Sequence, residues 1–401
     1  MILDGLRVLD FTWAAAGPTI TSFLVNLGAD VVKVETGGRP DVLRIANRSF
    51  GWNDDPSTEA SGAFNEMAAG KRSITLDLRT DEGRRIARRL AAEADVLVEN
   101  MRPGKIEQLG LSYEELSAEN PGLIMCSLSG SGHQDGAPLP GYAPIFWAEG
   151  GAAWFCGWPD EVPNYMRSPI DLHAGAFAFL GVMAALYERA ETGRGSYVDC
   201  SAIETIAWCV QDELVAAALG MEGPGRAGND RPPFAPHDVF PCQGDDEWIS
   251  IAVTNDAEWV RSCQVLDLER LSGDPRFALQ PDRWANRDAL WPEIAAATSR
   301  WNGETLARRL IDADVPAARM ARLVDLFGDP DLRSEGVWAA TEHPVVGSQD
   351  LVGLPFVIGD SPRHSGRPAP LLGEHTDAVL IEWLGLGDLD LRALRAGQVL
   401  E

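Results

Sequence analysis

The chain has 401 residues, of which 45% are apolar and 23% are charged, and its formal net charge is −26 at pH 7. A chain of this length is expected to form two domains, and so strong a negative charge argues against nucleic acid and anionic membrane surfaces as partners. The six cysteines have no CxxC spacing and no histidine at ligand spacing, which argues against a disulfide framework and against a zinc site.

The N-terminus and the apolar runs bear on localisation. MILDGLRVLDF has neither the basic segment nor the apolar segment of a signal peptide. The apolar runs are also shorter than the ~20 residues that a membrane-spanning helix needs. We therefore expect a cytoplasmic protein with no membrane partner.

Strand and helix patterns alternate through the first 130 residues. Short apolar runs predict five buried strands, at 6–11, 29–35, 71–78, 95–100 and 123–130. The clearest helical pattern between them covers 80–94, with a Thr at its start and an apolar stripe through Ile86 and Leu90. This series of βαβ units predicts an α/β fold with a parallel sheet.

The pattern changes in the middle of the chain. Residues 171–191 predict one long helix that is apolar on nearly every side and is therefore expected to be buried. Gly and Pro dominate 220–238, which predicts a linker, and short amphipathic helices follow over 256–320. Strand-like sequence returns at 336–345. We therefore expect a smaller second domain between residues 225 and 330.

Two motifs resemble known sites only superficially. The loop TWAAAGP after the first strand, with Glu35 after the second, resembles a dinucleotide site, but it lacks GxGxxG, so NAD is not expected. SLSGSGHQDG places Ser127 near His133 without the GxSxG spacing of a hydrolase, so a flexible loop is the better interpretation. The six histidines show no metal-ligand spacing, and no metal is expected.

The segment RSPIDLHAGAFAFLG (167–181) places Asp171 at the start of the long apolar helix. Asp is a favoured N-cap residue, with Ser168 as an alternative cap, so capping alone accounts for it. A reactive carboxylate is the second interpretation, because small apolar neighbours leave space beside it and burial alters its pKa and nucleophilicity. The pattern by itself leaves both interpretations open.

Five further motifs occur in order between residues 9 and 377: LDFTWAAAGP with LGADVVKVE, GKRSITLDL, ADVLVENMRPG, Asp171 followed by GVMAALYERAETGRG, and APLLGEHTD. Together they resemble the family III CoA-transferases (the CaiB/BaiF family), which include formyl-CoA transferases and α-methylacyl-CoA racemases. The resemblance implies a Rossmann-like large domain whose parallel sheet is built from both chain ends, 1–224 and 331–401. It also implies a smaller α+β domain over 225–330 and two chains interlocked as a homodimer.

The resemblance also indicates the chemistry. Transferases of the family carry an Asp ten residues before the Gly of a GILAAL-type helix, and Asp171 stands ten residues before Gly181. Racemases need a His where this chain has Tyr142, a poor proton acceptor at neutral pH. The resemblance therefore implies an acyl-CoA:carboxylate CoA-transferase, in which Asp171 forms an acyl-aspartyl anhydride and then an aspartyl-CoA thioester. The start of the helix is expected to keep Asp171 ionised.

Two alternatives stay open at this point. One is a 2-methylacyl-CoA racemase, and the other is a CoA-binding subunit of a heteromeric transferase. The expected partners are small molecules, an acyl-CoA and a carboxylic acid.

CoA or acyl-CoA is expected as substrate, with no metal or redox cofactor. The resemblance places CoA contacts at Leu76, Arg79, Asn100, Arg102, Lys105, Leu109, Ala15, Ala16 and Arg39. The cations among them are expected to meet the CoA phosphates, since an acidic protein needs local positive charge there. Thr36 and Gln108 depart from the family, because each stands where relatives carry an Arg, and Arg39 is a possible substitute for the first.

Aromatic residues suggest the acyl group. Trp13 and Tyr142 are expected to line the acyl pocket. A bulky or aromatic acid is suggested by Trp13, Trp147, Trp154, Phe155 and Trp158, although a core role for these side chains is the alternative. Oxalate and formate are disfavoured, because formyl-CoA enzymes carry a Gln where this chain has Ala15 and a run of glycines that FAPHDVFPCQGDDEW lacks.

Overall fold

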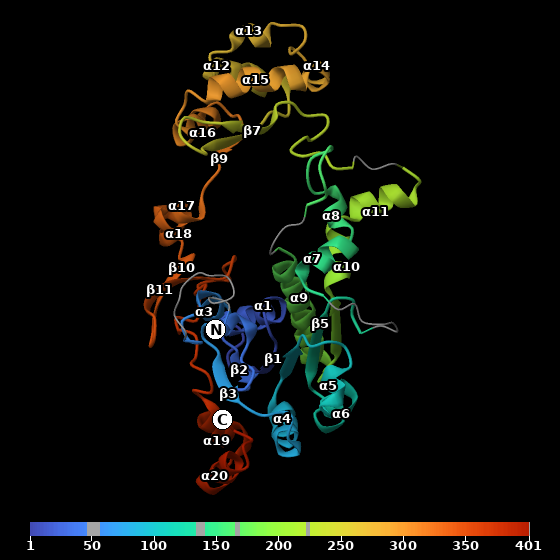
Figure 1. Cartoon of the computed structure of the whole chain (residues 1–401), viewed down its shortest axis with the longest axis vertical. Coiled ribbons are helices and arrows are strands. Elements are labelled where there is room, and N and C mark those ends of the chain that lie inside the picture. The colour runs from blue at the N-terminus through green and yellow to red at the C-terminus, as the bar shows by residue number, and fades with distance from the viewer. Residues whose placement is uncertain (46–56, 134–140, 165–168, 222–224, 401) are drawn as a thin grey trace. The chain divides into compact units, whose positions relative to one another are not determined.

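The computed structural model describes residues 1–45, 57–133, 141–164, 169–221 and 225–400. The chain divides into two compact units, and each is described by itself (Figure 1). Unit 1 consists of Met1–Ala153, Tyr165–Gly223 and Pro330–Glu401, and unit 2 of Trp154–Asn164 and Pro224–Asp329.

The segment Trp154–Asn164 differs from the expectation, which placed it in the large domain. It belongs to unit 2 because its main chain bonds to that unit, with the Gly228 amide donating to the Gly157 carbonyl at 2.9 Å.

A six-stranded parallel sheet forms the centre of unit 1, in the order β3-β2-β1-β4-β5-β6 (Figure 1). Its strands are β1 (Arg7–Phe11), β2 (Asp30–Glu35), β3 (Arg72–Thr75), β4 (Val96–Glu99), β5 (Ile124–Ser129) and β6 (Tyr197–Ser201). Val8 of β1 pairs with Val31 on one side and Val96 on the other. The five predicted strands are confirmed, since strands buried on both faces form continuous apolar runs.

Helices cover both faces of this sheet. The helices of unit 1 are α1 (Ala16–Asn26), η1 (Val42–Ile45), α3 (Gly62–Ala68), α4 (Asp81–Glu93), α5 (Lys105–Gln108), α6 (Tyr113–Glu119), α7 (Ala143–Glu149), α8 (Ala152–Phe155, whose last two residues belong to unit 2), α9 (Pro169–Thr192), α10 (Ala202–Cys209), α11 (Gln211–Ala218), α18 (Pro330–Ser334), α19 (Thr376–Leu384) and α20 (Asp388–Ala396). On one face, Leu9 and Phe11 of β1 join a core with α4, α6, α19 and α20. On the other face lies α1, toward which Asp10 points because side chains alternate along a strand.

The expectation that both chain ends build the sheet is wrong in one respect. All six strands lie between Arg7 and Ser201. The C-terminal part instead contributes helices and an antiparallel hairpin, β10 (Trp338–His343) and β11 (Gly347–Val352). Its helix α19 packs against α4 and β3, where the Thr75 amide donates to Thr376 Oγ1 at 3.0 Å, so it covers the sheet and adds no strand.

Unit 2 is an antiparallel sheet covered by helices. Its strands are β7 (His237–Pro241), β8 (Trp248–Ala252) and β9 (Ala317–Arg319). Its helices are α12 (Asp256–Val265), α13 (Glu269–Ser272), α14 (Gln280–Ala285), α15 (Arg287–Thr298), α16 (Gly303–Asp312) and α17 (Leu323–Gly328). Ile249 and Ile251 of β8 point into the core around Trp259 while Trp248 and Ser250 face outward, the alternation of a sheet with one buried face.

Helix α9 is longer and more apolar than the sequence analysis allowed for. Among the described residues, Ile170–Thr192 alone is long and apolar enough to span a membrane by length and composition. Ala174, Ala178 and Val182 are nevertheless buried inside unit 1, where α9 packs against α1 and the sheet. One face of α9 is thus packed inside unit 1, whereas Leu180 on another face is 63% exposed, so the expectation that the helix is buried on nearly every side is wrong in part.

Candidate functional site

Asp171 lies in the first turn of α9, which begins at Pro169. It is therefore not the N-cap residue, and the alternative cap, Ser168, lies outside the described residues. The side chain is partly buried, and burial raises the pKa of the Asp171 carboxyl above its ordinary value. This direction is opposite to the expectation that the start of the helix keeps the group ionised, and it makes the carboxylate a more basic nucleophile.

Two contacts define the direction of α9 across the sheet. Near its start, the thiol of Cys200, which lies at the end of β6, contacts the Ala174 carbonyl at 3.8 Å. Near its end, the Arg189 guanidinium donates to the Asp95 carboxylate, just before β4, at 3.0 Å. Helix α9 therefore runs antiparallel to the strands, and Asp171 lies at their carboxyl edge.

Helices α9 and α1 approach each other closely one turn after Asp171. Gly175 follows Asp171 by four residues, so both lie on one face of the helix. A Cβ on Gly175 would lie 2.6 Å from the Ala16 carbonyl oxygen and 2.6 Å from Thr19 Cβ. Glycine at this position therefore lets the first turn of α1 lie beside the first turns of α9.

The loop between β1 and α1 meets the segment after β4 at the topological switch point of the sheet. The Trp13 amide donates to Asn100 Oδ1 at 2.7 Å, and Asn100 Nδ2 donates to the Trp13 carbonyl at 2.9 Å. Ligands of open α/β sheets bind outside the carboxyl ends of the strands at such a point. The structure thus brings four of the predicted residues to the carboxyl edge of the sheet, Trp13, Ala15, Ala16 and Asn100, and of these Ala16 faces α9 at Gly175.

The predicted cations differ in their surroundings. The Arg39 guanidinium lies 4.8 Å from the ring centre of Trp13 and so joins the same cluster. The Arg79 side chain is 81% exposed and pairs with Asp77 at 2.7 Å, and its hydrogen bond lowers the pKa of Asp77. A phosphate at Arg79 would compete with that carboxylate. The other two cations are exposed close to the start of α5: Arg102 and Lys105.

Leu76 and Leu109 belong to the packing of unit 1. Leu76 is 2% exposed within the core beneath α4, and Leu109 packs against the same core. The Leu76 side chain is therefore enclosed by protein, and a contact between Leu76 and CoA would involve its main chain.

The aromatic residues predicted near the acyl group belong to both units. Tyr142 is the N-cap residue of α7 and is 80% exposed. Trp147 is buried in unit 1, which indicates a packing role. The other three residues belong to unit 2: Trp154, Phe155 and Trp158.

A buried network of charged side chains lies beneath the β1–α1 loop, and the sequence analysis missed it. Lys33 Nζ lies 2.9 Å from Asp41 Oδ2 and donates to the Thr12 carbonyl at 2.6 Å. Lys71 Nζ lies 3.2 Å from Asp10 Oδ2. The available signal was a charged residue inside each of two apolar strands, β1 and β2, because buried charges require partners.

Glu35 belongs to this network and does not extend toward a ribose. Arg44 Nη2 lies 2.9 Å from Glu35 Oε2, and the Ser73 hydroxyl donates to the same oxygen at 3.3 Å. Burial opposes ionisation of Glu35, but the hydrogen bonds from Arg44 prevail and lower its pKa. The carboxylate that the sequence analysis compared with a ribose-binding acid is thus occupied by an arginine.

His133 is held more firmly than a flexible loop would be. Its amide donates to Asp199 Oδ2 at 2.9 Å, and its ring Nδ1 lies 3.2 Å from Asp199 Oδ1. Its Nε2 lies 3.8 Å from Glu99, whose pKa is raised by burial. The rest of the predicted loop, 134–140, lies outside the described residues.

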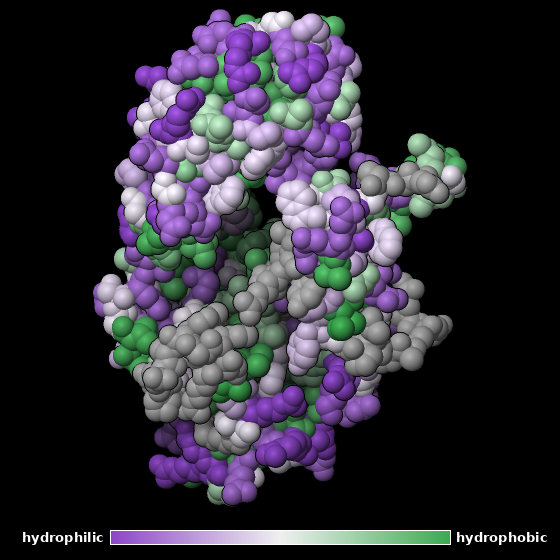
Figure 2. Space-filling model, turned by 45° about the horizontal axis from the view of Figure 1, so that its top comes forward, coloured by the Kyte–Doolittle hydropathy of each residue, from purple (hydrophilic) through white to green (hydrophobic). Residues whose placement is uncertain are grey.

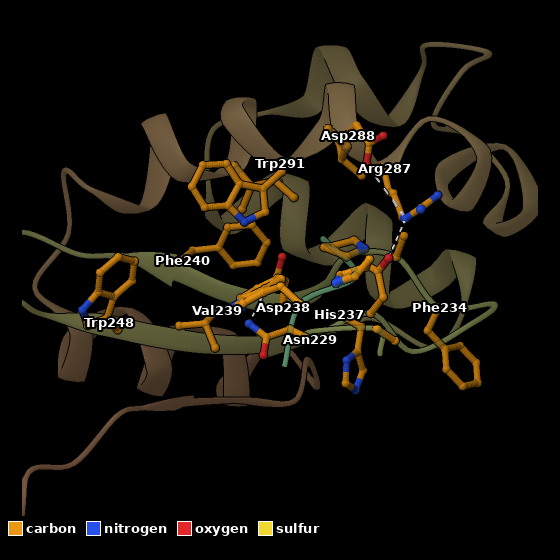
Figure 3. Close-up of a pocket in the computed structure, with 18 of the residues that line it drawn as sticks. Asn229, Phe234, His237, Asp238, Val239, Phe240, Trp248, Arg287, Asp288 and Trp291 are labelled. Carbon is orange, nitrogen blue, oxygen red and sulfur yellow. Dashed lines mark hydrogen bonds and ion pairs between the residues drawn. The ribbon is translucent and has the colours of Figure 1, made fainter. Parts of the chain in front are cut away.

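Unit 2 contains a pocket of about 790 Å³ (Figure 3). Trp291 stacks on Phe240 in its wall with ring centres 5.9 Å apart, and Arg287 pairs with Asp230 at 3.0 Å at its side. Of the residues predicted near the substrate, Trp158 lines this pocket. The remaining predicted residues of the site belong to unit 1 or to the segment around Trp154.

Comparison with known proteins gives consistent matches over the whole chain. The model of CoA-transferase family III matches residues 3–376. A succinyl-CoA–D-citramalate CoA-transferase of Chloroflexus aurantiacus is 32% identical over 99% of this chain and 98% of its own. A succinyl-CoA:mesaconate CoA-transferase of Haloarcula hispanica is 34% identical over 96% and 97%. The crystal structure of a CaiB/BaiF family protein from Brucella suis matches with a TM-score of 0.85 at 32% identity, over 95% of this chain and 99% of that one.

Proposed function

Because the chain belongs to CoA-transferase family III, we propose that it moves CoA from an acyl-CoA to a carboxylic acid with the Asp171 carboxylate as nucleophile. The observation that carries the proposal is the position of Asp171, at the carboxyl edge of the sheet and one turn before the contact of α9 with α1. Its raised pKa fits the role, since a more basic carboxylate attacks a thioester more readily.

The proposed reaction has two matched halves. The Asp171 carboxylate attacks the thioester carbonyl, and CoA leaves as a thiolate, which gives an acyl-aspartyl anhydride. The thiolate then attacks the aspartyl carbonyl of the anhydride, so the donor acid departs and an aspartyl-CoA thioester remains. The acceptor carboxylate repeats these steps in reverse order and restores the Asp171 carboxylate. No net proton or electron is transferred, and bonds of similar energy are exchanged.

Main-chain groups beside Asp171 are expected to bind the reacting atoms. The β1–α1 loop offers its amides at the switch point, where a tetrahedral oxyanion would gain about 3 kcal/mol from each well-placed donor. Arg39, beside Trp13, supplies positive charge for a CoA phosphate or a second carboxylate.

Two substrate classes are compatible with the site, and we give priority to short dicarboxylic acids. The two relatives described above use succinyl-CoA with citramalate or mesaconate. A bulky or aromatic acid was suggested by tryptophans of which Trp147 is buried and two belong to unit 2. Assaying CoA transfer from succinyl-CoA to a dicarboxylic acid, an aromatic acid and oxalate decides between them, and oxalate is expected to be the poorest acceptor.

Substitution of Asp171 tests the nucleophile. Asp171→Ala is expected to abolish CoA transfer between any active pair of acids. Asp81→Ala is the matched control, because Asp81 is also in the first turn of a helix but points into solvent. Transfer that survives in the Asp171→Ala variant would refute the assignment. Incorporation of α-deuterium from deuterated water into a chiral 2-methylacyl-CoA would instead support the racemase alternative.

We also propose a homodimer, for which the exposed apolar side chains provide support. Phe177 and Leu180 are exposed on α9, and Figure 2 shows hydrophobic residues gathered on α11, which include Leu214 and Val215. Light scattering should give twice the chain mass. Transfer by the purified chain alone would remove the need for a second, unlike subunit.

The six free cysteines agree with a reducing, cytoplasmic location.

A further inference from the structure

The β1–α1 loop has a main-chain conformation that alanine rarely adopts. Ala14 has a φ of 61°, in the left-handed region that favours glycine. The other described non-glycine residues with positive φ are three Asp and one Gln: Asp246, Asp267, Asp314 and Gln398. Asp in this conformation can bond to its own main chain, whereas alanine has no polar group with which to do so. Something outside the loop must therefore hold Ala14 in place.

The ion pair between Lys33 and Asp41 supplies that hold. Asp41 Oδ1 accepts a hydrogen bond from the Ala14 amide at 3.2 Å, and Lys33 Nζ donates to the Thr12 carbonyl at 2.6 Å. The pair thus binds the main chain on both sides of Trp13. Both side chains are only 1% exposed, so the bonds are shielded from water.

In the described part of the chain neither neighbouring buried pair bonds to Ala14, although Asp10 Oδ1 accepts a hydrogen bond from the Thr12 amide at 2.8 Å. Arg44 and Glu35 join η1 to the end of β2, and Lys71 with Asp10 joins the start of β3 to β1 and α1. Burying an ion pair seldom adds net stability compared with apolar side chains of the same size. The Lys33–Asp41 pair is therefore better explained by the loop geometry that it imposes than by a gain in stability.

We propose that Lys33 and Asp41 are positioning residues of the CoA-transfer site, which hold Ala14 in its left-handed conformation so that Trp13 and Ala15 lie beside the first turn of α9. The proposal rests on the function proposed above. Neither side chain touches substrate in this account. Their loss should therefore displace the loop and leave Asp171 itself intact.

A charge-neutral replacement tests the proposal. The double substitution Lys33→Met with Asp41→Leu removes both charges of the ion pair together, so that neither charge is left without the other. The expected result is a loss of at least tenfold in kcat/KM with a cooperative melting transition retained. Adding Ala14→Gly should restore at least threefold, since glycine adopts positive φ without strain. The matched control is Arg72→Met with Asp30→Leu, a pair at the opposite edge of the same sheet, which should lose less than threefold.

Each outcome is decisive. The positioning role is overturned if the Lys33→Met, Asp41→Leu variant keeps its kcat/KM within threefold of the wild type. It is also overturned if Ala14→Gly does not restore the lost activity, because the effect of a purely structural pair would not depend on the conformational freedom of residue 14. If the double variant fails to fold, Ala14→Val takes its place. It should lower kcat/KM at least tenfold, while Gln398→Val, which carries the same strain far along the chain, leaves kcat/KM unchanged.

The wild type separates this inference from the function on which it rests. CoA binding is measured by calorimetry and CoA transfer by product analysis on the same preparation. A wild type that neither binds CoA nor transfers it overturns both the function and the inference. A wild type that does both, with variants that match it, overturns the inference alone.

Discussion

The close packing of α9 against α1 predicts a sharp response to Gly175→Ala. The added Cβ would lie 2.6 Å from the Ala16 carbonyl oxygen, whereas ordinary contact begins at 3.4 Å. The two helices must therefore separate by about 0.8 Å at this point. Because the obstacle includes main-chain atoms, no side-chain rotation relieves it.

Two magnitudes follow from that displacement. Overpacking costs roughly 1–3 kcal/mol, and replacing a helical glycine by alanine returns up to about 1 kcal/mol. We therefore expect the free energy of unfolding to fall by about 1 kcal/mol. Misplacement of a reacting group by about 1 Å costs up to ~100-fold in rate, and Asp171 lies one turn from the point of contact. The expected loss in kcat is therefore at least tenfold, which exceeds the effect on stability.

Urea denaturation and steady-state CoA transfer measure the two effects. Gly181→Ala is the matched control, since its Cβ would lie 2.8 Å from a Val198 methyl group, at a position more than two turns of α9 after Asp171. It should lower stability by a similar amount and leave kcat within threefold. If Gly175→Ala is folded and keeps kcat within twofold, the placement of Asp171 against α1 is refuted.

Three further results are expected. Asp171→Asn should raise the melting temperature at pH 8, because burial raises the pKa of the Asp171 carboxyl and its ionisation therefore destabilises the fold. The gain in melting temperature should shrink as the pH falls toward 4. A melting temperature below that of the wild type at every pH would contradict this. Burial also raises the pKa of Glu66 to about 7, although the Val352 amide opposes the shift. At Glu66 the folded protein therefore binds more protons than the unfolded chain, so the free energy of unfolding, measured in urea, should rise as the pH falls from 8 to 5. Glu66→Gln should flatten that rise. An equal dependence on pH in the variant and the wild type would refute the explanation. Asn100→Ala should raise the KM for acyl-CoA about tenfold, because both hydrogen bonds between the Asn100 side chain and the Trp13 main chain are lost. The control Asn120→Ala, which loses three side-chain hydrogen bonds at the other edge of the sheet, should not raise it.

The parallel sheet was predictable because strands buried on both faces consist of unbroken apolar residues. Runs such as VLV (96–98) and LIMC (123–126) are of this kind, and the long helix over 171–191 is equally clear from its Ala-, Leu- and Phe-rich sequence. The break between α10 and α11 was not predictable, since Val210 is neither Gly nor Pro. The sequence there indicates a single long helix, whereas the structure has two.

The site was predictable in part. Trp13, Ala15, Ala16 and Asn100 come together because the carboxyl ends of β1 and β4 meet at the switch point, which the βαβ pattern implies. The network around Lys33 and Asp41 was not predicted, because one sequence does not reveal which charged residues are buried together. The direction of the Asp171 pKa shift also depends on how deeply the side chain is buried, which the sequence does not give.

The most direct test of the account is to trap the covalent intermediate. The protein is incubated with succinyl-CoA, treated with hydroxylamine and digested, and its peptides are sequenced by mass spectrometry. The account predicts a hydroxamate on Asp171, formed only after exposure to an acyl-CoA that the enzyme uses. An unmodified Asp171 peptide from a preparation that transfers CoA at full rate, or a modification on another carboxylate, would contradict it.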